Sequence, residues 1–222
     1  MIAHRAGLTG VHVATDVVLF TVRNRRLEVL LGREGEGAWH FPRGFVTGDE
    51  ALADCAAAAL DRDAGLRGVY LEQLYTFCLG PAAGRRVVSV AYYALAPDGR
   101  LHLGRRPGRL ATRWFPLDAL PELPEALGEM LDMAQRRLVA KLDYSTIAFQ
   151  FLPETFTLSE LQEVYEIIGR APLDKRNFRR RILALRQLEE TGRFRRNGSH
   201  RPARLYRLKE PGRVDIIKGR SL

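Results

Sequence analysis

The stretch that decides the fold of the first half is Trp39–Leu66, WHFPRGFVTGDEALADCAAAALDRDAGL. Proline and glycine interrupt its beginning, Trp39–Phe45, too often for a helix. The Ala-rich part predicts a helix over 49–64 that ends at Gly65. Gly44, at the start of this segment, is separated from Glu50 by five residues.

Strands surround this segment. The β-branched run Val11–Val22 and the run Leu27–Leu31 flank a polar turn and predict a hairpin. Further strands are predicted over 69–79, 86–96 and 113–117. A long helix is predicted over 123–142, because leucine, methionine and alanine recur there at helical spacing.

Charge divides the chain of 222 residues into two parts. Residues 1–142 hold 18 Lys and Arg against 16 Asp and Glu, a net charge of +2. Residues 143–222 hold 17 against 10, a net charge of +7. This contrast predicts two domains, 1–142 and 143–222, with different partners. An overall charge of +9 fits nucleic acid, an anionic membrane or phosphorylated ligands.

The second part predicts three helices and a hairpin. The helices are expected over 144–151, 158–168 and 174–190. Thr157 and Glu160 have the spacing of a capping box at the start of the middle helix. The basic stretch Arg193–Leu208 forms two short arms around Asn197-Gly198-Ser199, which predicts a hairpin. This order of elements is that of a winged helix-turn-helix domain.

The third helix and the hairpin carry the candidate DNA-binding residues. Phe178, Ile182, Leu185 and Leu188 recur on one face of the predicted helix, and most of the basic residues fall on the other side. In such domains the first turn of the recognition helix reaches base edges, and other basic groups contact phosphates. The candidates are Lys175, Arg176, Asn177, Arg179, Arg180, Arg195, Arg196, Arg201 and Arg204. A merely solvated basic face is the alternative for these residues.

The segment Trp39–Leu66 resembles the Nudix box, G-x5-E-x7-R-E-U-x-E-E-x-G-U with U aliphatic, together with the W-x-L-P-G-G-F-V run that precedes it in many Nudix proteins. The box holds divalent cations with glutamates that lie along one helix. Here Ala58 and Ala59 stand in place of its Arg-Glu pair, and Arg62 and Asp63 in place of its Glu-Glu pair. A guanidinium at the metal position repels a divalent cation. The domain is therefore expected to keep the Nudix fold, to hold no metal and not to be an enzyme.

The resemblance extends further. KLDYSTIAFQFLPETFTLSELQEVYEII, LDKRNFRRRIL and RPARLYRL look like the C-terminal domain of Nudix-related transcriptional regulators of the NrtR type. LEQLYTF, RVVSVAYYAL and RWFPLDALP continue the likeness in the first half. The resemblance implies an α+β chain, a Nudix-type α/β/α sandwich followed by a winged helix-turn-helix domain.

The same resemblance implies a homodimeric repressor that binds a palindromic operator in double-stranded DNA. Its Nudix domain would sense ADP-ribose or a related nucleotide sugar or sugar phosphate, and its targets would be genes of NAD metabolism or sugar utilisation. Arg43 and Glu50 are the candidate effector-binding residues. The alternative is a Nudix hydrolase of nucleoside diphosphate derivatives with a basic accessory domain. A sensor that no longer binds DNA is a third reading, which the run Lys175–Arg180 disfavours.

Composition adds three expectations. Cys55 and Cys78 are too few for a disulfide framework, which favours the cytoplasm. No apolar run approaches the roughly 18 residues of a membrane-spanning helix, and residues 1–10 do not read as a signal peptide. No motif indicates a cofactor.

Overall fold

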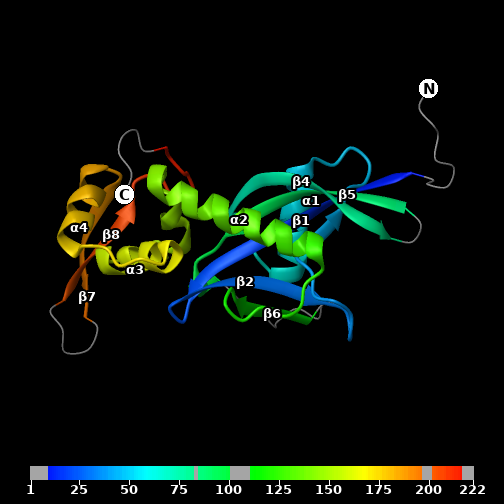
Figure 1. Cartoon of the computed structure of the whole chain (residues 1–222). Coiled ribbons are helices and arrows are strands. Elements are labelled where there is room, and N and C mark those ends of the chain that lie inside the picture. The colour runs from blue at the N-terminus through cyan, green and yellow to red at the C-terminus, as the bar shows by residue number, and fades with distance from the viewer. Residues whose placement is uncertain (1–9, 83–84, 101–110, 197–201, 217–222) are drawn as a thin grey trace, which may run out of the picture.

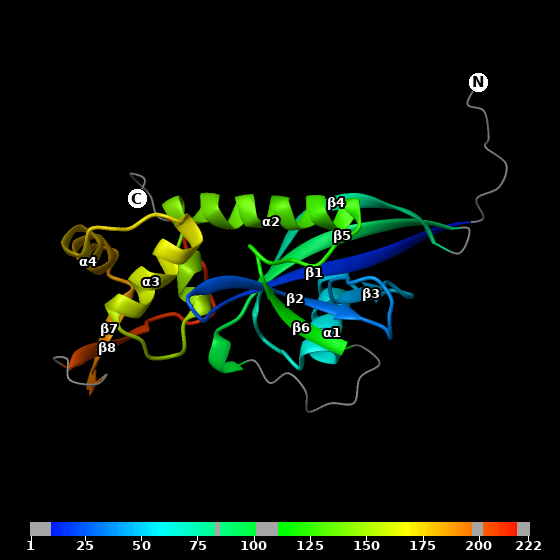
Figure 2. The same ribbon diagram turned by 60° about the horizontal axis from the view of Figure 1, so that its bottom comes forward.

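The computed structural model describes residues 10–82, 85–100, 111–196 and 202–216. A mixed sheet lies between two helices and is joined by the longer helix to a smaller helical part (Figures 1 and 2). The strands are β1 (Val11–Arg23), β2 (Arg26–Arg33), β3 (Arg43–Phe45), β4 (Tyr70–Ala82), β5 (Arg85–Leu95), β6 (Ala111–Pro116), β7 (Leu188–Arg195) and β8 (Ala203–Leu208). The helices are α1 (Leu52–Ala64), α2 (Glu125–Tyr144), α3 (Leu158–Gly169) and α4 (Lys175–Ala184), with 3-10 turns at Asp98–Arg100 and Ile147–Phe151.

The large sheet has the strand order β4-β5-β1-β2-β6, and β3 pairs with β1. The predicted hairpin is confirmed: β1 and β2 pair antiparallel, and the turn residues Asn24 and Arg25 both have positive φ. Neighbouring residues of β1 face opposite sides of the sheet, as the period of a strand requires. Val17 and Leu19 pack in the cluster that includes α1, while Val18 and Phe20 pack in the cluster that includes α2. The sheet is therefore covered on both faces, as an α/β/α sandwich requires.

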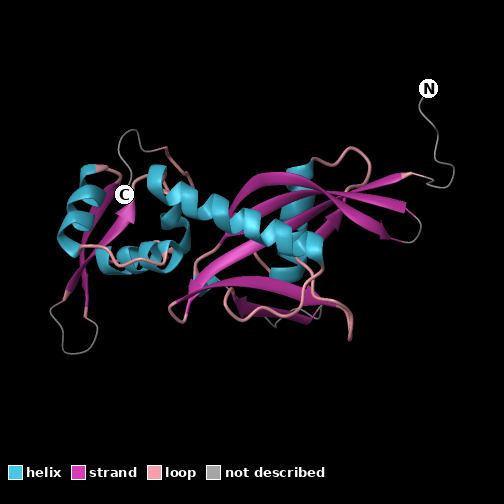
Figure 3. Ribbon diagram, viewed as in Figure 1, coloured by secondary structure: helices cyan, strands magenta, loops and turns pink. Residues whose placement is uncertain are grey.

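Helix α2 connects the two parts of the molecule (Figure 3). Its buried face consists of Leu127, Met130, Leu131, Ala134, Leu138 and Leu142. These side chains belong to one core cluster that continues from the sheet into α3 and α4. An ion pair between Arg25 and Glu163, 3.3 Å apart, adds a contact between the β1–β2 turn and α3. The two parts therefore share a continuous apolar core.

The second part is a winged helix in which α3 and α4 pack beside the β7-β8 hairpin. The capping box of α3 is confirmed, since Thr157 N–H donates to Glu160 Oε2 at 2.7 Å and Glu160 N–H donates to Thr157 Oγ1 at 3.2 Å. Two backbone hydrogen bonds between Phe156 and Tyr206 fasten β8 to the start of α3. The hairpin is thus held to the helices at its base.

Three sequence predictions need correction. The helix expected over 174–190 ends at Ala184, because Arg186 adopts a positive φ of 56° and Leu188 begins β7. Leu188 therefore lies on a strand. The helix expected over 144–151 is instead the end of α2 followed by a 3-10 turn. The helix expected over 49–64 begins only at Leu52, so Glu50 precedes it.

Phe178 anchors α4 to the rest of the winged helix. Its side chain is 3% exposed, and its ring meets that of Tyr165 edge to face at a centroid distance of 5.3 Å. We expect Phe178→Ala to lower the free energy of unfolding by about 3–5 kcal/mol, because it removes a buried aromatic ring and leaves a cavity. Urea-induced unfolding of the full chain measures the loss.

Leu183→Ala on the same helix is the matched control, because Leu183 is 46% exposed. It should lower the free energy of unfolding by less than about 1 kcal/mol. Equal losses in the two variants would contradict the assignment of Phe178 as the anchor.

Candidate functional site

The first candidate site lies where β3 meets α1. Gly44 is required there by a close approach: a Cβ at this position would lie 2.6 Å from Cys55 Sγ and 3.1 Å from the Cys55 carbonyl oxygen. Any larger residue would push α1 away from β3, because real Cβ atoms do not approach other atoms this closely. The glycine of the box therefore sets the distance between the loop and its helix.

Arg62, which the sequence comparison above set against the Glu-Glu pair of the Nudix box, lies in the last turn of α1. Its Nη2 donates to the carbonyl oxygen of Arg43 at 2.6 Å, and its Nε and Nη2 donate to the two carboxylate oxygens of Asp63 at 2.7 Å each. Hydrogen bonds to Asp63 raise the pKa of Arg62 above its ordinary value, despite an opposing effect of partial burial. The guanidinium is thus a permanent cation between a backbone carbonyl and a carboxylate. These are two of the oxygen types that a divalent cation accepts as ligands.

The side chain of Arg43 is held by Asp16 of β1. Its Nε donates to Asp16 Oδ1 at 2.9 Å, and Ser89 Oγ donates to Asp16 Oδ2 at 2.5 Å. The Asp16 carboxylate is fully buried, while the Arg43 side chain remains 26% exposed. Arg43 is therefore an anchored residue and not a freely solvated loop arginine.

The structure joins some of the predicted residues and separates others. Arg43 and Arg62 are joined by a hydrogen bond, whereas Glu50 is exposed in the segment before α1. Ala59 is fully buried. Among the residues that the structure describes, no group of three or more His, Cys, Asp and Glu side chains could hold a metal ion.

Asp16 and Ser89 were missed by sequence reasoning. The only signal was an acidic residue within the β-branched run of β1, where a buried charge requires a partner. The partner comes from β3, which pairs Arg43 directly opposite Asp16.

The second candidate site is the outer face of α4. Asp174 caps the helix, since its Oδ1 accepts a hydrogen bond from Asn177 N–H at 2.8 Å. Phe178 and Ile182 are buried, so the helix turns its other side to solvent. The exposed residues of that side include Lys175, Arg176, Asn177, Arg179 and Arg180. Arg180 Nη2 donates to Asn177 Oδ1 at 3.1 Å and so orients the amide.

The β7-β8 hairpin places its arginines differently. Arg195 donates to Glu160 Oε1 at 2.5 Å and to the Thr155 carbonyl oxygen at 3.1 Å, which ties the hairpin to the start of α3. Arg204 Nη1 donates to both carboxylate oxygens of Glu190, at 2.9 and 2.8 Å, on the exposed surface. Arg196 is exposed. Arg201 and the predicted turn Asn197-Gly198-Ser199 lie outside the described residues.

Comparison with protein-family models matches both parts of the chain. Residues 11–136 match the NUDIX domain, and residues 148–208 match the NrtR DNA-binding winged helix domain. No helix in the described ranges is long and apolar enough to cross a membrane.

Curated relatives and solved structures agree with these matches. The ADPR responsive transcriptional repressor NtrR of Acinetobacter baylyi is 31% identical over 205 residues, which cover 88% of this chain and 81% of the relative. The crystal structure of Shewanella oneidensis NrtR complexed with a 27mer DNA superimposes with a TM-score of 0.80 at 30% identity, covering 95% of this chain and 99% of that chain. Another crystal structure of Shewanella oneidensis NrtR gives a TM-score of 0.81 at 31% identity, with the same coverage.

Both domain matches follow the order that the sequence predicted, and the likeness to NrtR extends over nearly the whole chain. The chain therefore belongs to the NrtR family of transcriptional regulators, in which a NUDIX domain precedes a winged helix domain.

Proposed function

We propose that the chain is a transcriptional repressor that binds a palindromic operator in double-stranded DNA as a homodimer. Its Nudix domain binds ADP-ribose or a related nucleotide sugar or sugar phosphate and thereby controls operator binding. The target genes belong to NAD metabolism or sugar utilisation, and the protein acts in the cytoplasm. The observation that carries this proposal is the exposed basic side of α4, in a chain collinear with a regulator that was solved with DNA.

In this proposal α4 and the β7-β8 hairpin contact different parts of the DNA. Arg176 and Asn177 lie in the first turn of α4, from which recognition helices reach base edges in the major groove. Lys175, Arg179 and Arg180 contact phosphates. The hairpin residues contact the backbone or the minor groove, with Arg195 and Arg204 held in position by their ion pairs. The hairpin residues of this proposal are Arg195, Arg196, Arg201 and Arg204.

Base reading by α4 can be tested with Arg176→Ala and Asn177→Ala. Each should lower the affinity for the preferred DNA sequence by about 1–3 kcal/mol and relax specificity at one base position, because each removes a base contact. Gel-shift titration measures this, with a duplex that the full-length protein selects from a random-sequence library.

Lys209→Ala is the matched control, because Lys209 is a basic residue beyond β8 and lies outside both proposed DNA contacts. It should leave the base preference unchanged. If Arg176→Ala and Asn177→Ala bound every duplex as the unmodified protein does, α4 would not be the reading helix.

The effector site is proposed at the junction of β3 and α1. Arg43 and Glu50 are the proposed lining residues, and Arg62, which donates to the Arg43 carbonyl oxygen, adds a permanently charged guanidinium. Guanidinium groups bind phosphate oxygens through several hydrogen bonds at once. Both guanidinium groups pair with carboxylates, Arg43 with Asp16 and Arg62 with Asp63, so a diphosphate or sugar phosphate would bind through other N–H groups of the same guanidiniums.

Effector control is tested by titrating the selected duplex with and without ADP-ribose. ADP-ribose should weaken duplex binding by a factor in the typical range of ~5–150, and the duplex should weaken ADP-ribose binding by the same factor, because the two binding equilibria are linked. Fluorescence anisotropy measures the first factor, and calorimetry measures the second.

NAD and pentose phosphates serve as comparison ligands in the same titrations. If none of these ligands, ADP-ribose included, shifted duplex affinity although one of them bound tightly, effector control would be contradicted.

We also propose that the Nudix domain does not hydrolyse its ligand. Arg62 and Asp63 form an ion pair where the box needs carboxylates for cations, and Ala59 offers no ligand. The guanidinium would repel a divalent cation at this place. The alternative, a hydrolase of nucleoside diphosphate derivatives, needs a metal site at this junction.

Incubation with ADP-ribose and Mg²⁺ or Mn²⁺ tests this point. We expect no AMP above the level of a protein-free control, because the described residues at this junction include no carboxylate cluster that could hold a cation and activate water. Chromatography of the nucleotides measures the product, and a metal-dependent ADP-ribose hydrolase serves as the positive control. Clear turnover by the chain would favour the alternative.

A further inference from the structure

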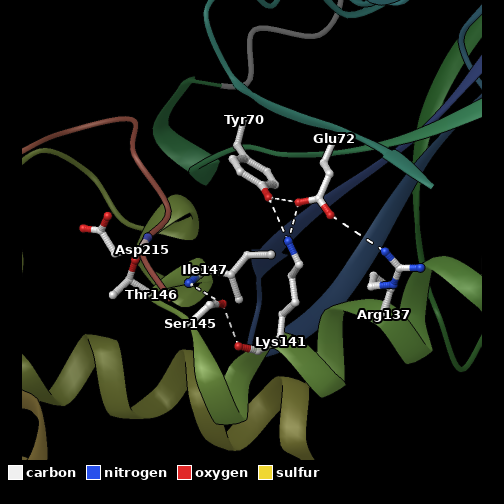
Figure 4. Close-up of polar contacts among 8 residues, drawn as sticks. All are labelled: Tyr70, Glu72, Arg137, Lys141, Ser145, Thr146, Ile147 and Asp215. Carbon is white, nitrogen blue, oxygen red and sulfur yellow. Dashed lines mark hydrogen bonds and ion pairs between the residues drawn. The ribbon is translucent and has the colours of Figure 1, made fainter. Parts of the chain in front are cut away.

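The last turn of α2 is fastened to the start of β4 by a polar cluster (Figure 4). Lys141 Nζ donates to Glu72 Oε2 and, at 3.3 Å, to the hydroxyl of Tyr70. The Tyr70 hydroxyl in turn donates to Glu72 Oε2. Arg137, one turn earlier in α2, places Nη1 3.9 Å from Glu72 Oε1. We call Tyr70, Glu72 and Lys141 the β4–α2 clasp.

The clasp is shielded from water and holds opposite charges. The Lys141 side chain is 15% exposed and the Glu72 side chain 28% exposed. Burial alone would raise the pKa of Glu72, but hydrogen bonds from Lys141 and Tyr70 outweigh it and lower that pKa. Burial would lower the pKa of Lys141, but the contact with Glu72 raises it. Both groups therefore stay charged at neutral pH, and separating them would leave each charge without its partner.

Lys141 also lies next to the connection to the winged helix. It follows the end of the NUDIX match at residue 136, and the winged helix match begins at residue 148. The Lys141 carbonyl oxygen accepts hydrogen bonds from Ser145 N–H at 2.9 Å and from Ser145 Oγ at 2.7 Å. Thr146 exchanges two hydrogen bonds with the backbone of Asp215: Thr146 N–H donates to the carbonyl oxygen at 3.0 Å, and Asp215 N–H donates to Thr146 Oγ1 at 2.9 Å. A movement of Lys141 is therefore transmitted to Ser145, at the start of the segment that connects α2 to the winged helix.

Tyr70 and Glu72, at the other end of the clasp, follow α1 closely in the sequence. Only residues 65–69 separate the end of α1 at Ala64 from Tyr70 at the start of β4. Within this short connection, Leu66 is buried among the residues that pack against α1. If ligand binding at Arg43 and Arg62 displaces α1, this five-residue connection is too short to absorb the displacement. The start of β4, with Tyr70 and Glu72, then moves as well.

We propose that the β4–α2 clasp couples the effector site to the winged helix, with Lys141 and Glu72 as positioning residues. This inference rests on the function proposed above. In this proposal ligand binding displaces α1, the start of β4 shifts with it, and the last turn of α2 follows Glu72 through the clasp. Because the clasp holds the two groups together, the orientation of the winged helix depends on the state of the effector site. A coupling of this kind must be demonstrated by a double-mutant cycle and not by position alone.

The test uses Glu72→Gln, Lys141→Met and the double variant of the full-length protein. For each, the affinity for the selected duplex is measured with and without saturating ADP-ribose, and the ratio is the coupling factor. The single variants should reduce this factor to less than about twofold, against the typical ~5–150-fold of a coupled protein. The double variant should lose no more than either single variant. Affinity for the duplex alone and for ADP-ribose alone should change less than about threefold.

Glu129→Gln is the matched control, because it removes the same charge from an exposed position of α2. It should keep the coupling factor of the unmodified protein. If the clasp variants also kept that factor, the inference would be overturned and the proposed function would stand. If the unmodified protein showed no effect of ADP-ribose, the proposed function would fail and the inference with it.

A milder change protects the test against misfolding, which thermal unfolding detects. Tyr70→Phe removes one hydroxyl and with it the hydrogen bonds between Tyr70 and the ion pair. It should lower the coupling factor at least twofold in a folded protein. An unchanged factor in this variant would overturn the inference even if Glu72→Gln and Lys141→Met failed to fold.

Discussion

The packing of α2 is the constraint on which the rest of the structure depends. Its buried face covers one side of the sheet, and the same core cluster continues into α3 and α4. A helix that contributes to two packed units cannot shift in one without disturbing the other, because protein interiors are packed as densely as crystals. The winged helix is therefore attached to the sandwich through the same apolar core that stabilises the sandwich.

Two ion pairs that are shielded from water add polar contacts to this apolar packing. Asp16 fixes Arg43 on β3, and Glu72 fixes Lys141 on α2. Paired charges in a shielded place hold their partners in one geometry, whereas exposed pairs contribute little. The first pair lies at the junction of β3 and α1, and the second lies where the sandwich meets the winged helix. The exposed pair of Arg204 and Glu190 belongs to the weaker kind, with side chains 59% and 53% exposed.

The parts of the fold that depend on local sequence could be predicted. The turn between β1 and β2, the cap at Gly65 and the capping box of Thr157 and Glu160 all depend on residues within a few positions of one another. The end of α4 could not be predicted, because Leu185 and Leu188 continue the helical spacing beyond Ala184. Pairing of β7 with β8 decides that region, and this pairing joins Leu188 to Leu208. Arg43 was found from the box, but its partner Asp16 lies 27 residues away, and Lys141 lies 69 residues from Glu72. No local pattern reports such pairs.

The guanidinium of Arg62 differs from a metal ion in one respect that matters to a sensor. It is covalently attached and permanently charged, so it does not dissociate and a chelator cannot remove it. A Nudix site that relies on Mg²⁺ is filled only as far as the supply of that ion allows. In the proposed effector site the positive charge belongs to a side chain of α1, so it is present whether or not a divalent ion is bound. Occupancy of the proposed site would then depend on the organic ligand and would need no bound divalent ion.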